Sequence, residues 1–302
     1  MVDLKCRLLF SCSKNKQPAL FIIQSSHKPT YPHPCPHVLH KMNPVIQSPQ
    51  NNQLKHLAKL LSASKHRREH QQTVLEGVHL LSAYLDAGNT PEQVYVPEHH
   101  AQSPEIAALL CRLPANRVHL VSHNALRKIS SLADANDIMA LIALPQPSPL
   151  PEQGDCVVLE RIQDTGNVGA VLRSAAAAGI VHIILSDSCA DAYAPKVLRA
   201  GMGAHFLLHI HERVDLTQWR SQYHDRVLVT ALSEHNNFSL YDLTLQQPSA
   251  WIFGNEGSGV SPQIQNIATA SVKIPMLGAT ESLNIAQAAT VCLFEQMRQR
   301  LK

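Results

Sequence analysis

Three segments in the second half of the chain combine glycines with side chains of the types that bind ligands. In the last of them, residues 274–288 (IPMLGATESLNIAQA), Pro275 ends strand pairing and a loop containing Gly278, Ser282 and Asn284 leads into an apolar helical pattern. Free backbone N–H groups and side-chain oxygens converge just before the start of a helix. The segment therefore predicts a binding loop at a helix N-terminus.

A second segment, residues 251–262 (WIFGNEGSGVSP), is a glycine-rich turn that directly follows an apolar run. Gly254, Gly257 and Gly259 let the backbone turn sharply and approach a ligand closely, and Glu256 adds a carboxylate. From these residues alone, a ligand-binding loop and a simple tight turn both remain open.

The third segment, residues 164–179 (DTGNVGAVLRSAAAAG), lies at a strand-to-helix transition, where α/β proteins hold ligands. Asn167, Gly169 and Arg173 are its candidate functional residues. The segment also imitates a dinucleotide-binding fingerprint, so a nicotinamide-dependent oxidoreductase is one alternative. Against that alternative, Asp164 stands where the fingerprint has its leading glycine, and an arginine follows at the start of the helix.

In their order along the chain, these three segments resemble the three motifs of the SpoU (TrmH-like) branch of the SPOUT RNA methyltransferases. The resemblance implies an α/β trefoil-knot domain with a mostly parallel sheet, working as a homodimer with the active site at the subunit junction. The implied activity is transfer of a methyl group from S-adenosylmethionine to a ribose 2′-oxygen of structured RNA, in the cytoplasm and without a metal. Ribosomal RNA is favoured over transfer RNA. A non-catalytic RNA-binding relative remains an alternative.

Within this resemblance, Arg173 contacts RNA phosphate and the reacting 2′-hydroxyl, either in its own subunit or across the dimer. A guanidinium suits that role because it stays charged and offers a planar fork to phosphate. Glu256 orients Arg173 or the ribose and aids proton removal. The implied catalytic positions are Arg173, Asn167, Glu256, Ser282 and Asn284, and the implied cofactor-binding positions are Gly254, Gly257, Ile274, Met276, Gly278 and Leu283.

One position departs from the family pattern. Ala286 stands where the motif usually has a serine, so we expect the loss of one hydrogen bond at the helix entry and modestly weaker cofactor binding. Glu281, Ser282 and Asn284 keep the rest of the motif, and we expect activity to be retained.

The two halves of the chain differ in charge. Residues 1–150 carry 15 Lys and Arg against 9 Asp and Glu, whereas residues 151–302 carry 11 against 14. The basic half is therefore the expected phosphate-binding part, with a merely soluble basic face as the alternative. The absence of a long apolar run argues against a membrane span. The seven scattered cysteines argue against a disulfide framework.

The sequence predicts four parts. Residues 1–48 form an extension without helical or strand periodicity, and our hypothesis is that its first 41 residues are dispensable or wrongly assigned. The histidines and cysteine between positions 33 and 40 lack a second ligand pair, so no metal is expected there. Residues 49–145 form an RNA substrate-binding domain, residues 146–154 a proline-rich linker, and residues 155–302 the SpoU catalytic domain.

Residues 53–68 predict one amphipathic basic helix with Leu54, Leu57, Leu60 and Leu61 on its apolar face. The expected RNA-binding side chains are Lys65, Arg67 and Arg68, together with Lys196 and Arg199 from the segment 195–206, and a solvated helix face is the alternative for each. The strands and helices that follow resemble, around residues 76–77 and 124–132, the ribosomal-protein-like domain often found before SpoU domains.

After the linker, continuous apolar runs alternate with helical stretches, which predicts a mostly parallel sheet covered on both faces. The final helix carries Ala286, Ala289, Leu293 and Met297 at helical spacing. This stripe predicts a dimer surface, with packing into the subunit's own core as the alternative.

Overall fold

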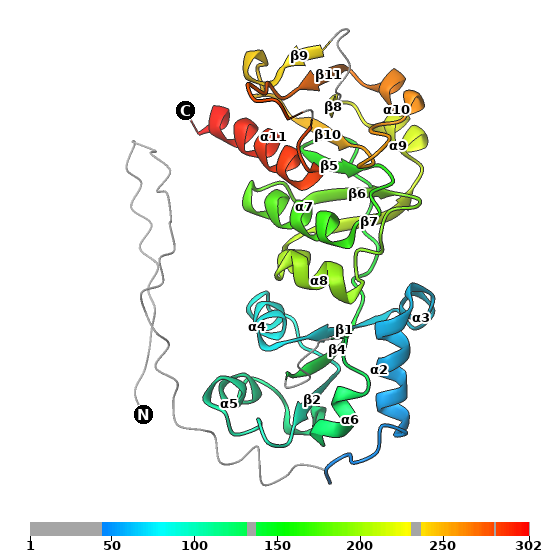
Figure 1. The fold of residues 1–302 in the computed structure, drawn as a ribbon, viewed down its shortest axis with the longest axis vertical. Helices are drawn as coiled ribbons and strands as arrows, with labels where there is room; N and C mark the ends of the chain where they lie inside the picture. Colours follow the sequence, from blue (N-terminus) through cyan, green and yellow to red (C-terminus); the bar gives the residue numbers. More distant parts are fainter. Residues whose placement is uncertain (1–43, 132–136, 231–236, 281, 302) are drawn as a thin grey trace.

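A computed structural model describes residues 44–131, 137–230, 237–280 and 282–301, and it contains two α/β units stacked along the long axis of the molecule (Figure 1). The first unit is built on a four-stranded sheet and the second on a seven-stranded sheet. In the described part of the chain, no helix combines the length and apolar character that crossing a membrane requires.

The N-terminal sheet has the order β1-β4-β2-β3, with β4 antiparallel to both of its neighbours and β2 parallel to β3. Its strands are β1 (Gln72–Glu76), β2 (Gln93–Pro97), β3 (Val118–Val121) and β4 (Met139–Ala143). The helices around it are α2 (Asn52–Ser62), α3 (Ser64–His70), α4 (Val78–Asp86), α5 (Pro104–Leu110), α6 (His123–Arg127) and the 3-10 turn η1 (Ala115–Arg117).

The predicted single helix over residues 53–68 is wrong, because the chain breaks between α2 and α3. Ala63 has an extended backbone, with φ −146° and ψ 136°. The hydroxyl of Ser62 donates to the carbonyl of Lys59 across 3.0 Å, a local bond that competes with helix continuation. The break turns α3 toward the C-terminal unit. Leu54, Leu57 and Leu60 are fully buried as predicted, and Leu61 is half-buried.

The boundary of the N-terminal extension also differs from the prediction. Ile46, which the sequence placed in the extension, forms a parallel bridge to Val121 and donates from its N–H to the carbonyl of Leu120 across 2.9 Å. At least residues 44–48 therefore belong to the first unit.

The C-terminal sheet has the order β7-β6-β5-β10-β8-β11-β9, and each of its described pairings is parallel, which confirms the mostly parallel sheet. The strands are β5 (Cys156–Leu159), β6 (His182–Ser186), β7 (His209–Val214), β8 (Arg226–Thr230), β9 (Asn237–Ser239), β10 (Ser249–Phe253) and β11 (Ala270–Lys273). The helices are α7 (Thr165–Ala177), α8 (Pro195–Gly201), α9 (Leu216–Gln222), α10 (Pro262–Ile267) and α11 (Ile285–Arg300), with 3-10 turns η2 (Ala204–Leu207) and η3 (Leu240–Asp242).

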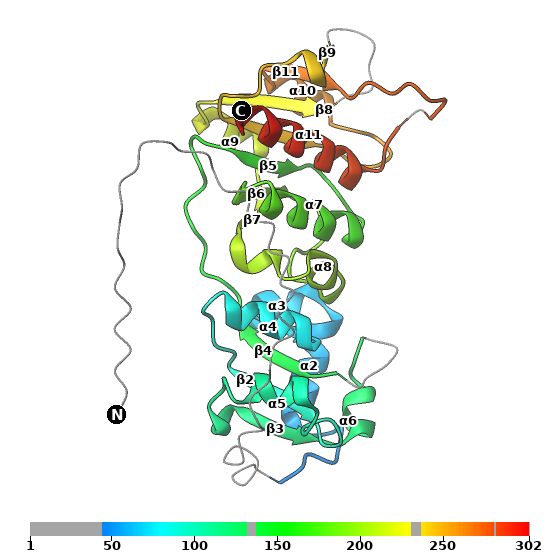
Figure 2. The same ribbon diagram turned by 90° about the vertical axis from the view of Figure 1, so that its left-hand side faces the viewer.

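Helices cover both faces of this sheet, which explains the continuous apolar runs in its strands. Alternate residues of one strand enter two different cores: Trp251 and Phe253 pack in the core under α7, α8 and α11, whereas Ile252 packs in the core under α9 and α10. Figure 2 shows α7, α8 and α11 along one side of the strands.

The C-terminal helix α11 packs on α7 rather than presenting its apolar stripe to solvent. Ala286, Ala289 and Leu293 are buried in the subunit's own core, and Met297 is half-buried. The predicted dimer surface on this stripe is therefore wrong, and the core-packing alternative holds.

The two units meet through α3 and β1 on one side and through α8 and the segment before it on the other (Figures 1 and 2). The hydroxyl of Thr73 donates to the carbonyl of Tyr193 across 3.0 Å at the centre of this contact, and both residues are buried. The linker also packs against the C-terminal unit, since the carbonyl of Pro151 accepts from the indole N–H of Trp219 across 3.0 Å. The units are therefore joined by a specific interface.

The described cysteines, at positions 111, 156, 189 and 292, are unpaired. Burial raises the pKa of Cys156 to about 12 and also raises the pKa of Cys292, so these thiols stay protonated at neutral pH. They are packing residues and not reactive ones.

Candidate active site

A pocket of about 450 Å³ lies at the carboxyl-terminal edge of the C-terminal sheet, where the end of β8 meets the loops after β10 and β11. This is the edge at which parallel sheets bind ligands. Eight residues predicted from the sequence line it: Gly254, Glu256, Gly257, Ile274, Met276, Ser282, Leu283 and Asn284. Gly278 is not among the lining residues.

The loop after β10 folds tightly back on itself at Gly254. A Cβ atom on Gly254 would lie 2.2 Å from the backbone nitrogen of Val260 and 2.3 Å from the carbonyl carbon of Gly259, so no other residue fits there. The side-chain oxygen of Asn255 accepts hydrogen bonds from the N–H groups of Gly257 and Ser258, at 3.0 and 3.1 Å. These bonds fix the turn, and its residues 254–260 line the pocket.

Three side chains, one from each sequence motif, form a hydrogen-bonded chain beside the pocket. The amide nitrogen of Asn167 donates to Oε1 of Glu256 across 3.0 Å, and the amide nitrogen of Asn284 donates to Oδ1 of Asn167 across 2.9 Å. The structure therefore brings the three segments together at one point through their polar side chains.

The start of α7 positions Asn167. Asp164 caps this helix, and its Oδ1 accepts from the N–H of Asn167 across 2.8 Å. Gly169 is a packing glycine, since a Cβ there would lie 2.4 Å from the Cβ of Ala200 on α8. Asp164, which stands where a dinucleotide fingerprint has its leading glycine, thus caps α7. Gly169, which matches a glycine of that fingerprint, allows α7 to pack closely on α8.

Asn284 also caps α11, because its Oδ1 accepts from the N–H of Ala286 across 2.9 Å. The entry of α11 is therefore capped by the side chain of Asn284. Ala286 itself is buried in the core. Glu281, the other polar residue of this motif, lies outside the described residues.

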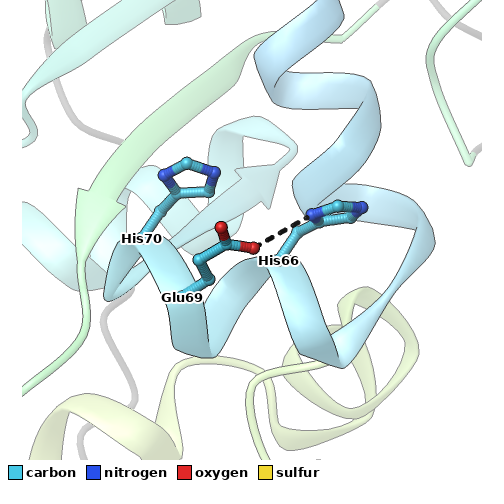
Figure 3. Close-up of side chains that lie close together, drawn as sticks. All are labelled: His66, Glu69 and His70. Atoms are coloured by element: carbon cyan, nitrogen blue, oxygen red, sulfur yellow. Dashed lines mark ion pairs between the residues drawn. The ribbon is translucent and has the colours of Figure 1, made fainter.

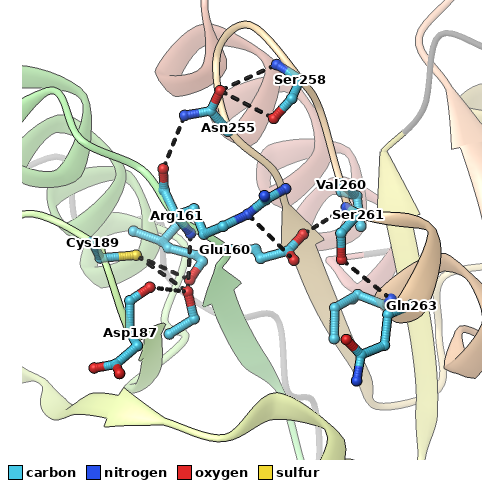
Figure 4. Close-up of polar contacts among 12 residues, drawn as sticks. Glu160, Arg161, Asp187, Cys189, Asn255, Ser258, Val260, Ser261 and Gln263 are labelled. Carbon is cyan, nitrogen blue, oxygen red and sulfur yellow. Dashed lines mark hydrogen bonds and ion pairs between the residues drawn. The ribbon is translucent and has the colours of Figure 1, made fainter.

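Two residues that the sequence did not single out hold the glycine-rich loop at both ends (Figure 4). Glu160 is only 5% exposed, and its carboxylate accepts from the N–H of Ser261 across 2.8 Å. The carbonyl of Arg161 accepts from the side-chain amide of Asn255 across 3.0 Å, and Arg161 adopts a left-handed backbone with φ 56°. The one sequence signal for these two contacts was the acidic residue Glu160 directly after the apolar strand β5.

Arg173 is exposed and makes no hydrogen bond or ion pair with another described residue. It does not line the pocket. It follows Asn167 by six positions, which places it roughly 9 Å further along α7 and on a different side of the helix. The structure thus places Arg173 outside the pocket lining.

The predicted RNA-binding residues fall into two groups. Lys65, Arg68 and Lys196 are exposed. Arg67 is 4% exposed and donates from Nε and Nη2 to the carboxylate of Asp191, at 2.9 and 2.7 Å. The prediction of Arg67 as an RNA contact is wrong, because its guanidinium is buried in the interface between the two units and bonded to Asp191.

Arg199 is also engaged at that interface. Its Nη1 donates to Oε2 of Glu76 across 2.9 Å and to the hydroxyl of Ser131 across 2.8 Å. Glu76 is buried, so Arg199 is the counter-charge of a buried carboxylate. This bond ties α8, and through it α7, to the N-terminal unit.

Comparison with known proteins supplies the family. The model of the SpoU rRNA Methylase family matches residues 155–294, and that of the MRM3-like substrate binding domain matches residues 51–140. An uncharacterized tRNA/rRNA methyltransferase of Synechocystis is 35% identical over 261 residues, covering 84% of this chain and 94% of the relative.

Two further proteins bear on the site. The 23S rRNA guanosine 2′-O-methyltransferase RlmP of Bacillus subtilis is 26% identical, over 82% of this chain and 97% of its own. The crystal structure of the SpoU methyltransferase AviRb from Streptomyces viridochromogenes, in complex with the cofactor AdoMet, matches with a TM-score of 0.73 and 25% identity, over 83% of this chain and 98% of its own. This chain therefore belongs to the SpoU family of S-adenosylmethionine-dependent RNA methyltransferases.

Proposed function

We propose that this protein methylates a ribose 2′-oxygen of ribosomal RNA. The observation that carries the proposal is the Glu256–Asn167–Asn284 chain, which gathers polar groups from all three motifs beside the pocket. The names of the relatives support the substrate: RlmP acts on 23S rRNA as a 2′-O-methyltransferase, and the mitochondrial rRNA methyltransferase 3 of mouse is 26% identical to this chain.

The pocket residues fit S-adenosylmethionine. The pocket lies within the size range of small-molecule sites, about 300–1,000 Å³. The close approach of backbone at Gly254 leaves N–H and C=O groups to recognise the cofactor, and Ile274, Met276 and Leu283 supply apolar surface. When bound, S-adenosylmethionine supplies an electrophilic methyl group for direct displacement.

In this proposal the chain's own residues align the ribose and accept its proton. Glu256 is held by Asn167, so its carboxylate has one fixed position from which it orients the 2′-hydroxyl and receives its proton. Ser282 and Asn284 position the acceptor nucleotide beside it. The contribution of these groups is alignment and charge stabilisation.

We assign Arg173 to the active site of a second subunit in a homodimer. The support is that Arg173 is exposed and lies outside the lining of its own pocket, on a helix fixed to α11 by the Ser174–Thr290 hydroxyl contact of 2.7 Å. From there its guanidinium stabilises negative charge developing on the ribose oxygen. Lys65, Arg68 and Lys196 supply contacts to RNA phosphates.

A non-catalytic RNA-binding relative is the second candidate. It would bind RNA without cofactor-dependent methylation, and the presence of Asn167, Glu256 and Asn284 in one hydrogen-bonded chain favours catalysis instead. The nicotinamide alternative is separable by thermal shift, because only a cofactor that binds the folded protein raises its melting temperature.

The test uses RNA from cells that lack this gene, in which the target nucleotide is unmodified. Purified protein and S-adenosylmethionine are incubated with the ribosomal and the transfer RNA fractions separately, and ribose methylation is mapped in each. The proposal expects one new modified position in ribosomal RNA. Methylation confined to transfer RNA would overturn the substrate class, and no methylation in either fraction would favour the non-catalytic candidate.

A further inference from the structure

The short helix α3 carries two histidines and a carboxylate that converge on one point (Figure 3). His66 and His70 are one helical turn apart, Glu69 lies between them, and one ligand atom from each lies within 4.8 Å of the others. We propose that His66, Glu69 and His70 form a Zn²⁺ site on the surface of the substrate-binding unit. This inference is independent of the proposed methyl transfer.

The geometry needs only small side-chain adjustments. Nδ1 of His66 and Oε2 of Glu69 are 3.8 Å apart. In a tetrahedral site with bonds of about 2.0–2.1 Å, donor atoms lie roughly 3.3–3.4 Å from one another. The side chains of His66 and Glu69 are 33% and 59% exposed, so they are free to rotate inward without moving the backbone.

The helix that carries the three donors is held in place by other contacts. A helix of this length is marginal on its own. Arg67 on the same helix, however, is buried and is bonded to Asp191 and to the carbonyl of Leu60. The ring of His70 also packs edge-on against His56, with centroids 4.7 Å apart. The spacing between the ligands is therefore fixed before a metal binds.

The donor set selects the class of metal. Two imidazoles and one carboxylate suit Zn²⁺, whereas Mg²⁺ and Ca²⁺ prefer oxygen ligands. Three protein donors leave the fourth position of a tetrahedral site open to water. Lys65 and Arg68 are exposed on the same helix and add positive charge. We therefore expect weaker binding than in an enclosed cysteine-containing site.

The order H-x-x-E-H also occurs in one class of metalloproteases, where the glutamate acts as a base on a water molecule. Here the carboxylate of Glu69 lies between the two rings and serves as a ligand. Glu69 and His70 are exposed on a surface helix, and the site is not part of the pocket formed by the three motifs. The geometry thus assigns metal binding to these residues, without hydrolysis.

The test is a Zn²⁺ titration of the full chain against a chromogenic chelator. His33, Cys35, His37 and His40 also offer ligands, so they are replaced by alanine in every protein compared. The test variants are His66→Ala/His70→Ala and Glu69→Gln. His79→Ala is the matched control, because His79 is an exposed histidine on α4. Far-UV circular dichroism verifies that each variant is folded.

The parent and His79→Ala are expected to bind one Zn²⁺ with equal affinity. The double histidine variant is expected to lose this site or to bind at least about tenfold more weakly, with Glu69→Gln in between. Equal stoichiometry and affinity in the parent and the double variant would overturn the proposal. An equal loss in His79→Ala would do so as well, because it would show dispersed binding to surface histidines.

Discussion

The amide nitrogen of Asn167 donates to Oε1 of Glu256 across 3.0 Å, although 89 residues separate the two in the chain. Asn167 stands at the start of α7 and Glu256 in the loop after β10, so this bond joins two of the three motifs. The other end of the Asn167 amide accepts from Asn284 of the third motif. One side chain thus sets the relative positions of the groups proposed to hold the ribose.

The first prediction concerns that side chain. Asn167→Ala removes the donor to Glu256 and the acceptor for Asn284, so the carboxylate loses its fixed position. We expect kcat to fall by about a hundredfold, the usual effect of removing one preorganised hydrogen-bonding group from an active site. Single-turnover methylation measures kcat, and calorimetry is expected to show cofactor affinity close to that of the unmodified protein. Asn266→Ala, an exposed asparagine on α10, is the matched control. An unchanged rate in Asn167→Ala would contradict the role.

The second prediction concerns the hydrogen bond from Ser261 to Glu160 at the end of the glycine-rich loop. Glu160→Gln weakens the charge-assisted bond to the N–H of Ser261, which loosens one end of the cofactor loop. Hydrogen bonds to charged groups contribute about 1.5–3 kcal/mol, so we expect affinity for S-adenosylmethionine to fall by about tenfold. Calorimetric titration measures it.

The control for this variant is Glu212→Gln. Glu212 also accepts from a backbone N–H, that of Ala192, across 2.8 Å, but it lies on β7 and away from the loop. Equal losses of cofactor affinity in both variants would contradict the prediction. They would show that weakening either carboxylate destabilises the C-terminal unit, and that Glu160 does not act specifically on the cofactor loop.

A third prediction follows from the position of Arg173. Arg173→Ala is expected to abolish methyl transfer while leaving cofactor binding intact, because the side chain lies outside the lining of its own pocket. Mixing this variant with Asn167→Ala is expected to restore part of the activity, since mixed dimers then contain one intact composite site. Wild-type rates in Arg173→Ala alone would remove the residue from catalysis. A lack of rescue in verified mixed dimers would place its action within one subunit.

The interface between the units gives a fourth prediction. Arg199→Ala leaves the buried carboxylate of Glu76 without its counter-charge, although the hydroxyl of Ser131 still bonds to it. We expect the free energy of unfolding to fall by about 2 kcal/mol, measured by urea denaturation. Lys196→Ala removes an exposed cation from the same helix and is expected to change stability by less than about 0.5 kcal/mol. Equal effects of the two substitutions would contradict the account of this interface.

The fifth prediction concerns pH. Burial lowers the pKa of His205 from 6.5 to about 4, partly opposed by its bond to the carbonyl of Ala192. In the unfolded chain the imidazole takes up a proton near pH 6.5, whereas in the folded chain it stays neutral until about pH 4. Stability from this group is therefore lost as pH falls from 6.5 to 4, by about 3 kcal/mol at most.

His205→Gln is expected to flatten the fall in unfolding free energy over that pH range. The other described groups with lowered pKa, His119, His182 and His211, are present in both proteins and cancel in the comparison. Parallel pH profiles for the two proteins would contradict the assignment to His205.

The sequence predicted those features that depend on local pattern. Apolar runs between helices predicted the parallel sheet, and residues 274–288 predicted a loop leading into a helix, which begins at Ile285. Eight of the predicted site residues line one pocket because the motifs after β10 and β11 follow strands whose carboxyl ends meet at one edge of the sheet.

The features that the sequence did not predict depend on contacts far apart in the chain. Arg67 reads as a surface residue of a basic helix, yet it pairs with Asp191, 124 residues away. In the sequence, Glu160 is only the residue after a predicted strand. Its contact with Ser261, 101 positions away, forms only in the folded protein. The spacing of apolar residues in α11 was correct, but spacing alone did not distinguish a core face from a dimer face.

Nucleoside analysis tests the central claim most directly. Purified protein is incubated with S-adenosylmethionine and unmodified ribosomal RNA, the RNA is digested to nucleosides, and the products are separated by liquid chromatography with mass spectrometry. We predict one 2′-O-methylated nucleoside that forms only when S-adenosylmethionine is present and is strongly reduced with Asn167→Ala. A methyl group on a base, or no methylated nucleoside, would contradict the account.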